Sequence, residues 1–438
     1  MIISNQMLWK CSAFTSIYKI KDNVLLFSSI NGKLLKFTPK QFTVIQEIFN
    51  SVKDTGTSSQ KELIELLSSQ AFLVPADFDE IEAAHQKYLA NIHNNKRLVL
   101  VLSPTMRCNF SCSYCFEKNA VKGSDMTNDT QEKLIGLVKN KLEEGGLLDI
   151  QWFGGEPYMA FQTIESLTKH FQEICNEKNA IYEAGIITNG SLLTLDNISR
   201  LEHLHITNMQ ITLDGTPETF SRHKRISLEN AIEFYDRIYT QIPYLIKQLK
   251  HLCIRINIDR NNYKEAYYVV DELSKRGLID NRIDLRLGLL EGKNGIVDCI
   301  PHSCLSSEEY LEFDLEFKEY IFKQGFTVYS YPMPQLYPCA TVTENSYSID
   351  PSGNIYHCVP ETGQGQDVKA TLDHMDEYQP NEYQGFDPWN ITGCKTCSLL
   401  PICLGRCPRR QVYEKPYKCL TKYKFDERLL LYSNCQRR

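Results

Sequence analysis

Six apolar β runs alternate with amphipathic helical stretches between residues 98 and 290, and this alternation constrains the fold more than any other feature. The runs begin at residues 98, 147, 184, 209, 252 and 283 and read LVLVLS, LLDIQWF, AGIITN, MQITLD, LCIRINID and IDLRLGLL. The helical stretches include Thr130–Glu144, Phe161–Lys178, Leu228–Leu249 and Tyr263–Arg276. Repeated βα units predict an α/β fold with a parallel sheet. Six units fit a partial barrel or a doubly wound sheet, and both place ligand chemistry at the carboxyl ends of the strands.

The chain of 438 residues is long enough for two or three domains. Residues 1–95 contain three short alternating runs, from Ser16 to Ile20, Val24 to Ser28 and Lys33 to Phe37. With an Asn31-Gly32 hairpin turn signal and three helical patterns, they predict a winged-helix-like α+β module. Its alternative role is a plain extension packed on an enzyme. Residues 96–305 hold the βα repeats, and residues 306–438 hold a cysteine-rich tail that we expect to depend on metal for its fold. We therefore predict three domains with these boundaries.

Charge and composition narrow the class of protein. The net charge of -6 carries no broad basic footprint, so we expect no nucleic-acid partner. The amino terminus has no signal-peptide pattern and no apolar run approaches 18 residues, so we expect a cytoplasmic protein with no membrane partner. Sixteen cysteines are unusual as free thiols or disulfides in a reducing compartment. Clustered cysteines there more often bind metal.

Three cysteines follow the first strand of the repeat in the segment RCNFSCSYCFE. Cys108, Cys112 and Cys115 form a Cys-x3-Cys-x2-Cys pattern. Three thiolates in one loop can hold three irons of a [4Fe–4S] cube and leave the fourth iron without a protein ligand. The alternatives are a zinc knuckle that lacks its fourth ligand, or three unrelated thiols.

With this spacing and the aromatic Tyr114, the chain resembles the radical S-adenosylmethionine (SAM) superfamily. The resemblance implies a partial (β/α)6 barrel in which Cys108, Cys112 and Cys115 bind a catalytic cluster. The open iron of that cluster binds the methionine part of SAM. An electron from an external low-potential donor, flavodoxin- or ferredoxin-like, then produces a 5′-deoxyadenosyl radical. The cofactor does the hard chemistry and the protein positions it.

Other positions that resemble the family lie at predicted strand ends. Gly154, Gly155 and Glu156 belong to a GGEP segment, which by resemblance holds the methionine ammonium. Thr188 and Asn189 belong to a TNG segment that contacts the methionine carboxylate or the ribose. Either segment alone reads as a simple turn.

The fourth and fifth strands carry further candidates. Asp214 ends the fourth strand, where a site role and a structural role are equally open. The family's usual His-Asp pair is absent from the segment after it, and Phe220–Arg225 stands there instead. On the fifth strand we assign Asn257 as a contact to the adenosine of SAM. Arg255 shares its face, by alternation, and is a cofactor contact or a buried structural pair.

The tail resembles the SPASM extension of peptide-modifying radical enzymes, which houses two auxiliary [4Fe–4S] clusters and so brings the expected total to three. By resemblance, the outer cluster binds Cys394, Cys397, Cys403 and Cys419. The inner cluster binds Cys339, Cys358 and Cys407. Sulfatase-maturing relatives have one more cysteine where this chain has Asn345. The fourth inner ligand is therefore Cys304, Cys299 or an open iron. Spacing alone also permits one zinc site of Cys394, Cys397, Cys403 and Cys407.

These features together favour a radical SAM enzyme that matures a ribosomally made precursor peptide. Its leader segment would bind the amino-terminal module by strand addition, and a thioether, carbon–carbon or related crosslink would form. One alternative is a sulfatase-type maturase that makes formylglycine. Another is a non-catalytic zinc or iron–sulfur scaffold.

Overall fold

The computed structural model describes residues 8–50, 58–119, 125–290, 303–328, 332–365, 367–379, 383–413 and 419–435. The chain divides into two compact units. The first comprises Met1–Asn94, Ser330–Thr343 and Glu382–Arg438, and the second comprises Asn95–Tyr329 and Glu344–Asn381. Within the described residues, no helix is both long and apolar enough to cross a membrane.

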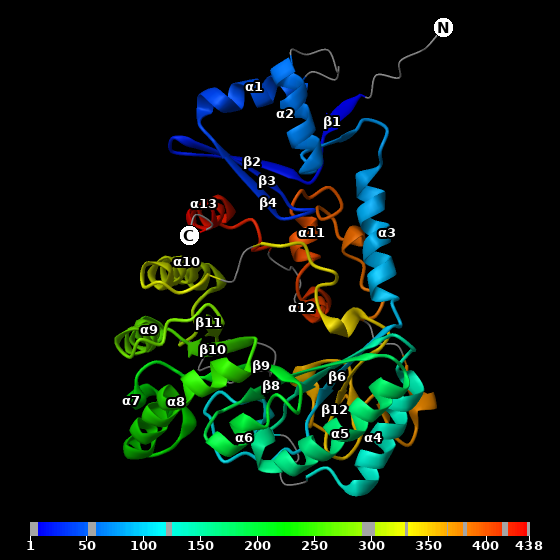
Figure 1. The fold of residues 1–438 in the computed structure, drawn as a ribbon, viewed down its shortest axis with the longest axis vertical. Coiled ribbons are helices and arrows are strands. Elements are labelled where there is room, and N and C mark those ends of the chain that lie inside the picture. Colours follow the sequence, from blue (N-terminus) through cyan, green and yellow to red (C-terminus); the bar gives the residue numbers. More distant parts are fainter. Residues whose placement is uncertain are drawn as a thin grey trace. The chain divides into compact units, whose positions relative to one another are not determined.

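Six parallel strands form the centre of the second unit, and they coincide with the six predicted runs (Figure 1). They are β6 (Arg97–Leu102), β7 (Leu147–Trp152), β8 (Ile181–Thr188), β9 (Ile206–Thr212), β10 (His251–Ile258) and β11 (Ile283–Leu289). Their order in the sheet is sequential from β6 to β11. A doubly wound sheet reverses its strand order at a switch point, so the structure selects the partial-barrel alternative.

Helices between the strands supply the rest of this core. They are α4 (Asn128–Lys141), α5 (Phe161–Glu177), α6 (Leu195–Ser199), α7 (Pro217–Lys224), α8 (Leu228–Gln248), α9 (Ala266–Lys275) and α10 (Ser307–Lys323). Apolar residues at helical spacing point to the sheet, as in α5, where Ile164, Leu167 and Phe171 are fully buried. Side chains of α10 join the same core, so the sixth βα unit is complete.

The sheet continues beyond the six strands on the side of β6. β12 (Ser346–Ile349) pairs parallel to β6, with Ser346 opposite Val99, and β13 (Asn354–Tyr356) and β14 (Ala370–Thr371) follow antiparallel. The compact units therefore differ from the three predicted segments. Both α10 and β12–β14 lie after residue 305, yet they belong to the barrel unit because they pack in its core and extend its sheet.

The first unit has the predicted α+β character. A meander of β2 (Thr15–Ile20), β3 (Asn23–Ser28) and β4 (Lys33–Phe37) lies beside a two-stranded pair, β1 (Trp9–Cys11) with β5 (Leu73–Pro75). Its helices are α1 (Pro39–Asn50), α2 (Ser58–Ser69), α3 (Glu80–Ile92), α11 (Leu400–Cys403), α12 (Pro408–Tyr413) and α13 (Phe425–Cys435). Gly32 in the predicted turn has φ 73°, which glycine adopts without strain.

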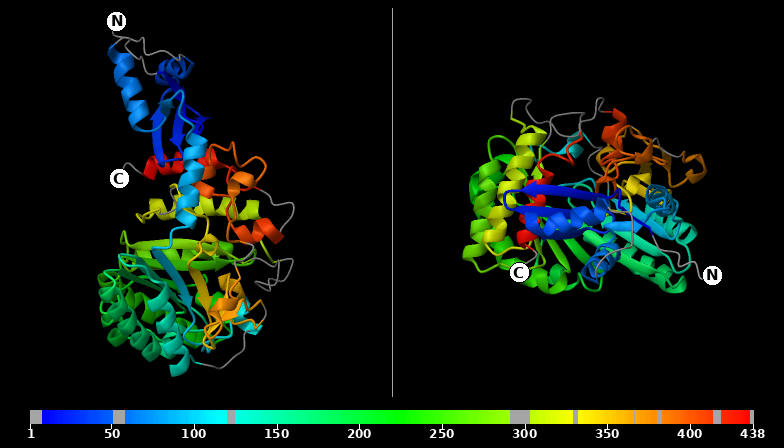
Figure 2. Two further views of the ribbon diagram at one scale, coloured as in Figure 1. Left: turned by 90° about the vertical axis from the view of Figure 1, so that its right-hand side faces the viewer. Right: turned by 90° about the horizontal axis from the view of Figure 1, so that it is seen from above.

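Part of the cysteine-rich tail packs on the amino-terminal strands of this unit. Leu25 and Phe27 of β3 are fully buried against Leu399, Phe425 and Leu429. Figures 1 and 2 show α13 (red) beside the blue strands. The two ends of the chain therefore build one hydrophobic core.

Candidate active site

The segment after β6 carries the three cysteines predicted to bind the catalytic cluster. Cys108 is exposed, while Cys112 and Cys115 are half-buried. Burial, then Glu117 and the two neighbouring thiols, raise the pKa of Cys115 to about 12. In the part of the chain that the structure describes, no three His, Cys, Asp or Glu side chains stand close enough to hold a metal ion. The chemistry of the donors fits an iron–sulfur cluster, because one loop offers three soft thiols and such clusters bind thiolates. We call residues 105–117 the cluster loop.

The GGEP turn lies directly against the start of the cluster loop. The Gly155 amide donates to the Thr105 carbonyl at 3.1 Å, and the Glu156 amide donates to the Arg107 carbonyl at 2.8 Å. A Cβ atom on Gly154, where φ is 100°, would lie 2.6 Å from the Thr105 oxygen, and one on Gly155 would lie 2.6 Å from the Arg107 carbonyl carbon. The glycine pair is therefore required by close backbone approach.

An ion pair fixes the same stretch of loop from its other side. Arg107 donates to Asp125 through Nε (2.8 Å) and through its terminal nitrogen (2.6 Å), and Thr105 donates to Asp125 at 2.6 Å. The pattern of cysteines and glycines gave no sign of this contact. An arginine and an aspartate 18 residues apart leave no local signature in the sequence.

Glu156 joins the ends of β7 and β8. Its side chain is fully buried and accepts hydrogen bonds from the Tyr158 amide (3.0 Å), the Thr188 hydroxyl (2.7 Å) and the Asn189 amide (2.7 Å). Burial raises the pKa of Glu156, although these three hydrogen bonds act to lower it. The structure thus brings the GGEP and TNG segments together, and Glu156 holds the TNG turn in place.

Asn189 carries that contact onward to the first cysteine. Its side-chain nitrogen lies 3.9 Å from Cys108 Sγ and donates to Asn109 at 2.9 Å, while its oxygen accepts from the Ser191 amide at 2.8 Å. Two strand ends therefore reach the Cys108 side of the cluster loop.

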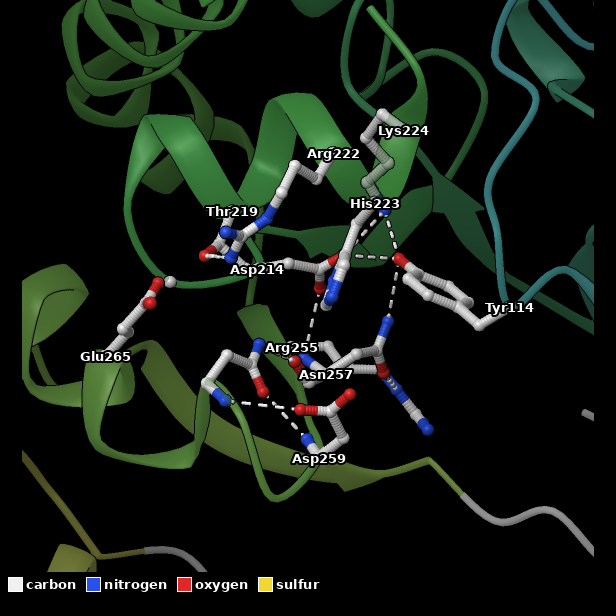
Figure 3. Close-up of polar contacts among 12 residues, drawn as sticks. Tyr114, Asp214, Thr219, Arg222, His223, Lys224, Arg255, Asn257, Asp259 and Glu265 are labelled. Carbon is white, nitrogen blue, oxygen red and sulfur yellow. Dashed lines mark hydrogen bonds and ion pairs between the residues drawn. The ribbon is translucent and has the colours of Figure 1, made fainter. Parts of the chain in front are cut away.

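Tyr114 is the centre of a second network on the other side of the loop (Figure 3). Its hydroxyl donates to Asp214 and accepts from Lys224 Nζ and, at 3.1 Å, from Asn257 Nδ2. The main-chain amide of Asn257 donates to Asp214 Oδ1 at 3.1 Å. Arg255 Nε donates to Asn257 Oδ1 at 2.8 Å, which confirms that Arg255 and Asn257 share a face of β10. The predicted residues Tyr114, Asp214 and Asn257 thus lie together.

Asp214 is a buried charge with a buried counterion. Lys224 Nζ lies 3.1 Å from its carboxylate, and His223 Nδ1 lies 3.5 Å away. Burial alone would raise the pKa of Asp214, but Lys224 and His223 outweigh it and bring the pKa down to about 2. Burial would likewise lower the pKa of Lys224, and the nearby Asp214 raises it instead. Both groups are ionised across the physiological range.

Sequence reasoning missed Lys224 and His223. They stand in the segment where the family's usual residues are absent, and basic residues at the end of a helix more often face solvent and stabilise the helix dipole. An aspartate at a strand end followed ten residues later by a lysine was the one available signal.

Four cysteines of the tail gather within the first unit. Burial, followed by Cys403, Cys397 and Cys419, raises the pKa of Cys394 to about 11. Cys403 is similarly affected by burial, Cys397 and Cys419. These four are the set that the SPASM resemblance implies for the outer cluster.

The residues predicted for the inner cluster are divided between the units. Cys339 and Cys407 belong to the first unit and Cys358 to the second, so their assignment to one cluster stays a prediction. Of the possible fourth ligands, Cys304 is disulfide-bonded and Cys299 lies outside the described residues.

Comparison with known proteins identifies the barrel. Residues 102–248 match the model of the radical SAM superfamily. The chain is 22% identical to the radical SAM cyclopropyl synthase TigE of Paramaledivibacter caminithermalis, over 90% of this chain and 89% of that protein. It is 27% identical to an S-adenosylmethionine-dependent nucleotide dehydratase of Fibrobacter sp., over 47% of this chain and 60% of that protein.

Two solved structures share the fold. The structure of anSMEcpe with bound AdoMet and Cp18Cys peptide has a TM-score of 0.55 and 17% identity, and covers 77% of this chain and 99% of its own. Streptococcus suis SuiB bound to precursor peptide SuiA has a TM-score of 0.52 and 18% identity, and the match covers 93% of this chain and 97% of SuiB. With the barrel, the cluster loop and these matches, residues 102–248 are a radical SAM domain, and the chain is a radical SAM enzyme.

Proposed function

We propose that this enzyme matures a ribosomally made precursor peptide by removing a hydrogen atom from one of its residues, which leads to a thioether, carbon–carbon or related crosslink. The similarity to a cyclopropyl synthase along nearly the whole of both chains carries this proposal. The fold match to SuiB with its precursor peptide covers 93% of the chain and thus most of residues 8–94. That supports binding of the leader segment by the amino-terminal module.

The residues around the cluster loop support the same chemistry. In this proposal Cys108, Cys112 and Cys115 bind the [4Fe–4S] cluster that the family implies. When bound, this cluster and SAM supply the 5′-deoxyadenosyl radical, and auxiliary clusters in the tail supply an electron acceptor. Gly154 and Gly155, which lie against the backbone of Thr105 and Arg107, would stand beside the methionine part of SAM.

The buried polar side chains orient the cofactor rather than move protons. Glu156 fixes the turn of Thr188 and Asn189, which would contact the methionine part or the ribose, while Asn257, which donates to Tyr114, would contact the adenosine. We assign Asp214 a positioning role, because a carboxylate paired with Lys224 and held at a pKa of about 2 is a poor proton acceptor.

The tail cysteines complete the proposed cofactor set of three clusters. Cys394, Cys397, Cys403 and Cys419, whose charges influence one another, would hold the outer cluster. Cys339, Cys358 and Cys407 would hold the inner one, with Cys304, Cys299 or an open iron position completing it. An external flavodoxin- or ferredoxin-like donor would reduce the enzyme.

The competing proposal is a sulfatase-type maturase. The anSMEcpe fold match leaves about a quarter of this chain uncovered. In addition, Asn345 takes the place of a cysteine expected for that class. Its side chain donates to the Asn95 carbonyl at 3.1 Å, and its carbonyl accepts from Val99, so it fixes β12 beside β6.

The test uses short peptides encoded beside the gene, with deuterium at candidate positions. The anaerobically reconstituted enzyme is mixed with SAM, reductant and peptide, and both products are analysed by mass spectrometry. We expect deuterium in 5′-deoxyadenosine and a peptide that has lost a pair of hydrogens. Formylglycine in the product would favour the sulfatase-type alternative. Zinc without deoxyadenosine would favour the scaffold.

A further inference from the structure

The carboxyl end of α7 lies against the cluster loop and binds it through main-chain groups. The Ser113 amide donates to the His223 carbonyl at 2.8 Å, and the Ser111 amide donates to the Lys224 carbonyl at 3.4 Å. The last carbonyls of a helix have no donor within the helix. Here the amides of Ser111 and Ser113, on either side of Cys112, donate to these carbonyls.

The helix ends at this point because of one residue. Arg225 has φ 56° and ψ 49°, the left-handed conformation that commonly closes a helix. The Ile226 amide then donates back to the Ser221 carbonyl at 3.1 Å. The carbonyls of His223 and Lys224 are thereby left available to the loop.

The side chain of Lys224 makes a second connection to the same loop. It is 3% exposed, and its ammonium contacts the Tyr114 hydroxyl and lies 3.1 Å from Asp214. It also lies 4.9 Å from the centre of the Tyr114 ring and 5.2 Å from that of Phe220. A lysine is almost never this buried unless it is paired. Figure 3 shows it reaching from the helix end to Tyr114.

Aromatic packing gives a third connection. Phe110 of the cluster loop meets Phe220 of α7 edge-on at 6.1 Å and Phe234 of α8 at 6.2 Å. Loop residues 110, 111, 113 and 114 are thus all held by α7 or α8, and they bracket Cys112.

We propose that the carboxyl end of α7 positions the cluster loop, with Lys224 as the positioning residue that locks Tyr114 and thereby sets the places of Cys112 and Cys115. This inference rests on the proposed role of these cysteines as cluster ligands. It assigns a task to the segment that departs from the family's usual residues. A purely structural Lys224 would stabilise the barrel without any special effect on the loop.

Hydrogen exchange of the full chain, before any cluster is loaded, separates these roles. Lys224→Met is compared with Tyr114→Phe, which removes only the hydroxyl and leaves the Lys224–Asp214 pair. Lys133→Met is the control, since Lys133 forms an exposed ion pair with Asp129 in the same unit. We expect exchange in peptides covering residues 108–116 to rise about tenfold in Lys224→Met, as for loss of one charged hydrogen bond, and less in Tyr114→Phe.

The control should leave exchange in this segment unchanged, and Lys224→Arg should restore part of the protection. If both variants fold and neither Lys224→Met nor Tyr114→Phe speeds exchange in residues 108–116, the inference is overturned. If Lys224→Met does not fold, Tyr114→Phe decides alone: faster exchange in the loop supports the proposal and unchanged exchange refutes it.

A spectroscopic measurement on the loaded enzyme addresses the cluster itself. Electron paramagnetic resonance of the reduced cluster, with and without SAM, should differ between Tyr114→Phe and wild type and match wild type in Lys133→Met. Identical spectra in Tyr114→Phe would count against the inference. Failure of the wild-type chain to load iron would instead contradict the proposed function, and the exchange result would still stand.

Discussion

Replacement of Gly155 by alanine tests the close approach between the GGEP turn and the cluster loop. The added Cβ would lie 2.6 Å from the Arg107 carbonyl carbon and 2.8 Å from that of Met106. Both are backbone atoms, so the contact cannot be relieved by a side-chain rotation. Overpacking of this kind costs about 1–3 kcal/mol, and we place Gly155→Ala near the upper end, at ~3 kcal/mol. At roughly 2–4 °C per kcal/mol, the melting temperature should fall by about 6–12 °C.

A matched control is available in α4. A Cβ on Gly136 would meet nothing within 4 Å, and Gly136 lies inside a helix. Gly136→Ala should therefore stabilise the enzyme by about 0.5–1 kcal/mol, the usual gain for alanine in a helix. Calorimetry measures both melting temperatures, and iron analysis after reconstitution reports on the loop. Opposite signs are expected, with lower iron content in Gly155→Ala alone. A Gly155→Ala enzyme with wild-type melting temperature and iron content would refute the close-approach argument.

Three further changes probe the charges, the tail and the strand ends. Asp214→Asn leaves Lys224 buried without its counterion and should cost about 3–5 kcal/mol at neutral pH in urea unfolding. Because the pKa of Asp214 is lowered from 3.8 to about 2, its stabilisation is present above pH 3.8, and the difference from wild type should shrink as the pH falls toward 2. Cys403→Ser should remove about four irons per chain by colorimetric analysis. Cys435→Ser, at the end of α13, should remove none, because the resemblance assigns Cys435 to no cluster. Asn189→Ala loses the bond to the cluster loop and should weaken SAM binding about tenfold in equilibrium dialysis; unchanged affinity would exclude Asn189 from the site.

Local patterns predicted most of the regular structure. The six strands of the barrel sheet and the three strands Thr15–Ile20, Asn23–Ser28 and Lys33–Phe37 coincide with runs seen in the sequence, because each buries one or both faces. The choice between barrel and doubly wound sheet depends on strand order, which local periodicity does not encode. Pairing of β12 with β6 joins residues almost 250 positions apart, as Ser346 opposite Val99 shows. A pairing between segments so far apart in the chain cannot be read from local patterns in the sequence.

The candidate site was predictable where spacing reflects chemistry. The glycine pair is a consequence of close backbone approach, and the predicted residues Tyr114, Asp214 and Asn257 do lie together. Lys224 was not predictable, because its burial depends on how α7 ends and on which groups surround it in space.

Reductive cleavage of SAM by the reconstituted full chain tests the central claim most directly. We expect 5′-deoxyadenosine release by the wild-type enzyme, with about twelve irons per chain for three cubane clusters. A variant with Cys108, Cys112 and Cys115 all replaced by alanine should release none and keep about eight irons, while Cys435→Ser should behave as wild type. Deoxyadenosine release that persists in the triple variant, or a wild-type enzyme that binds zinc and never cleaves SAM, would contradict it.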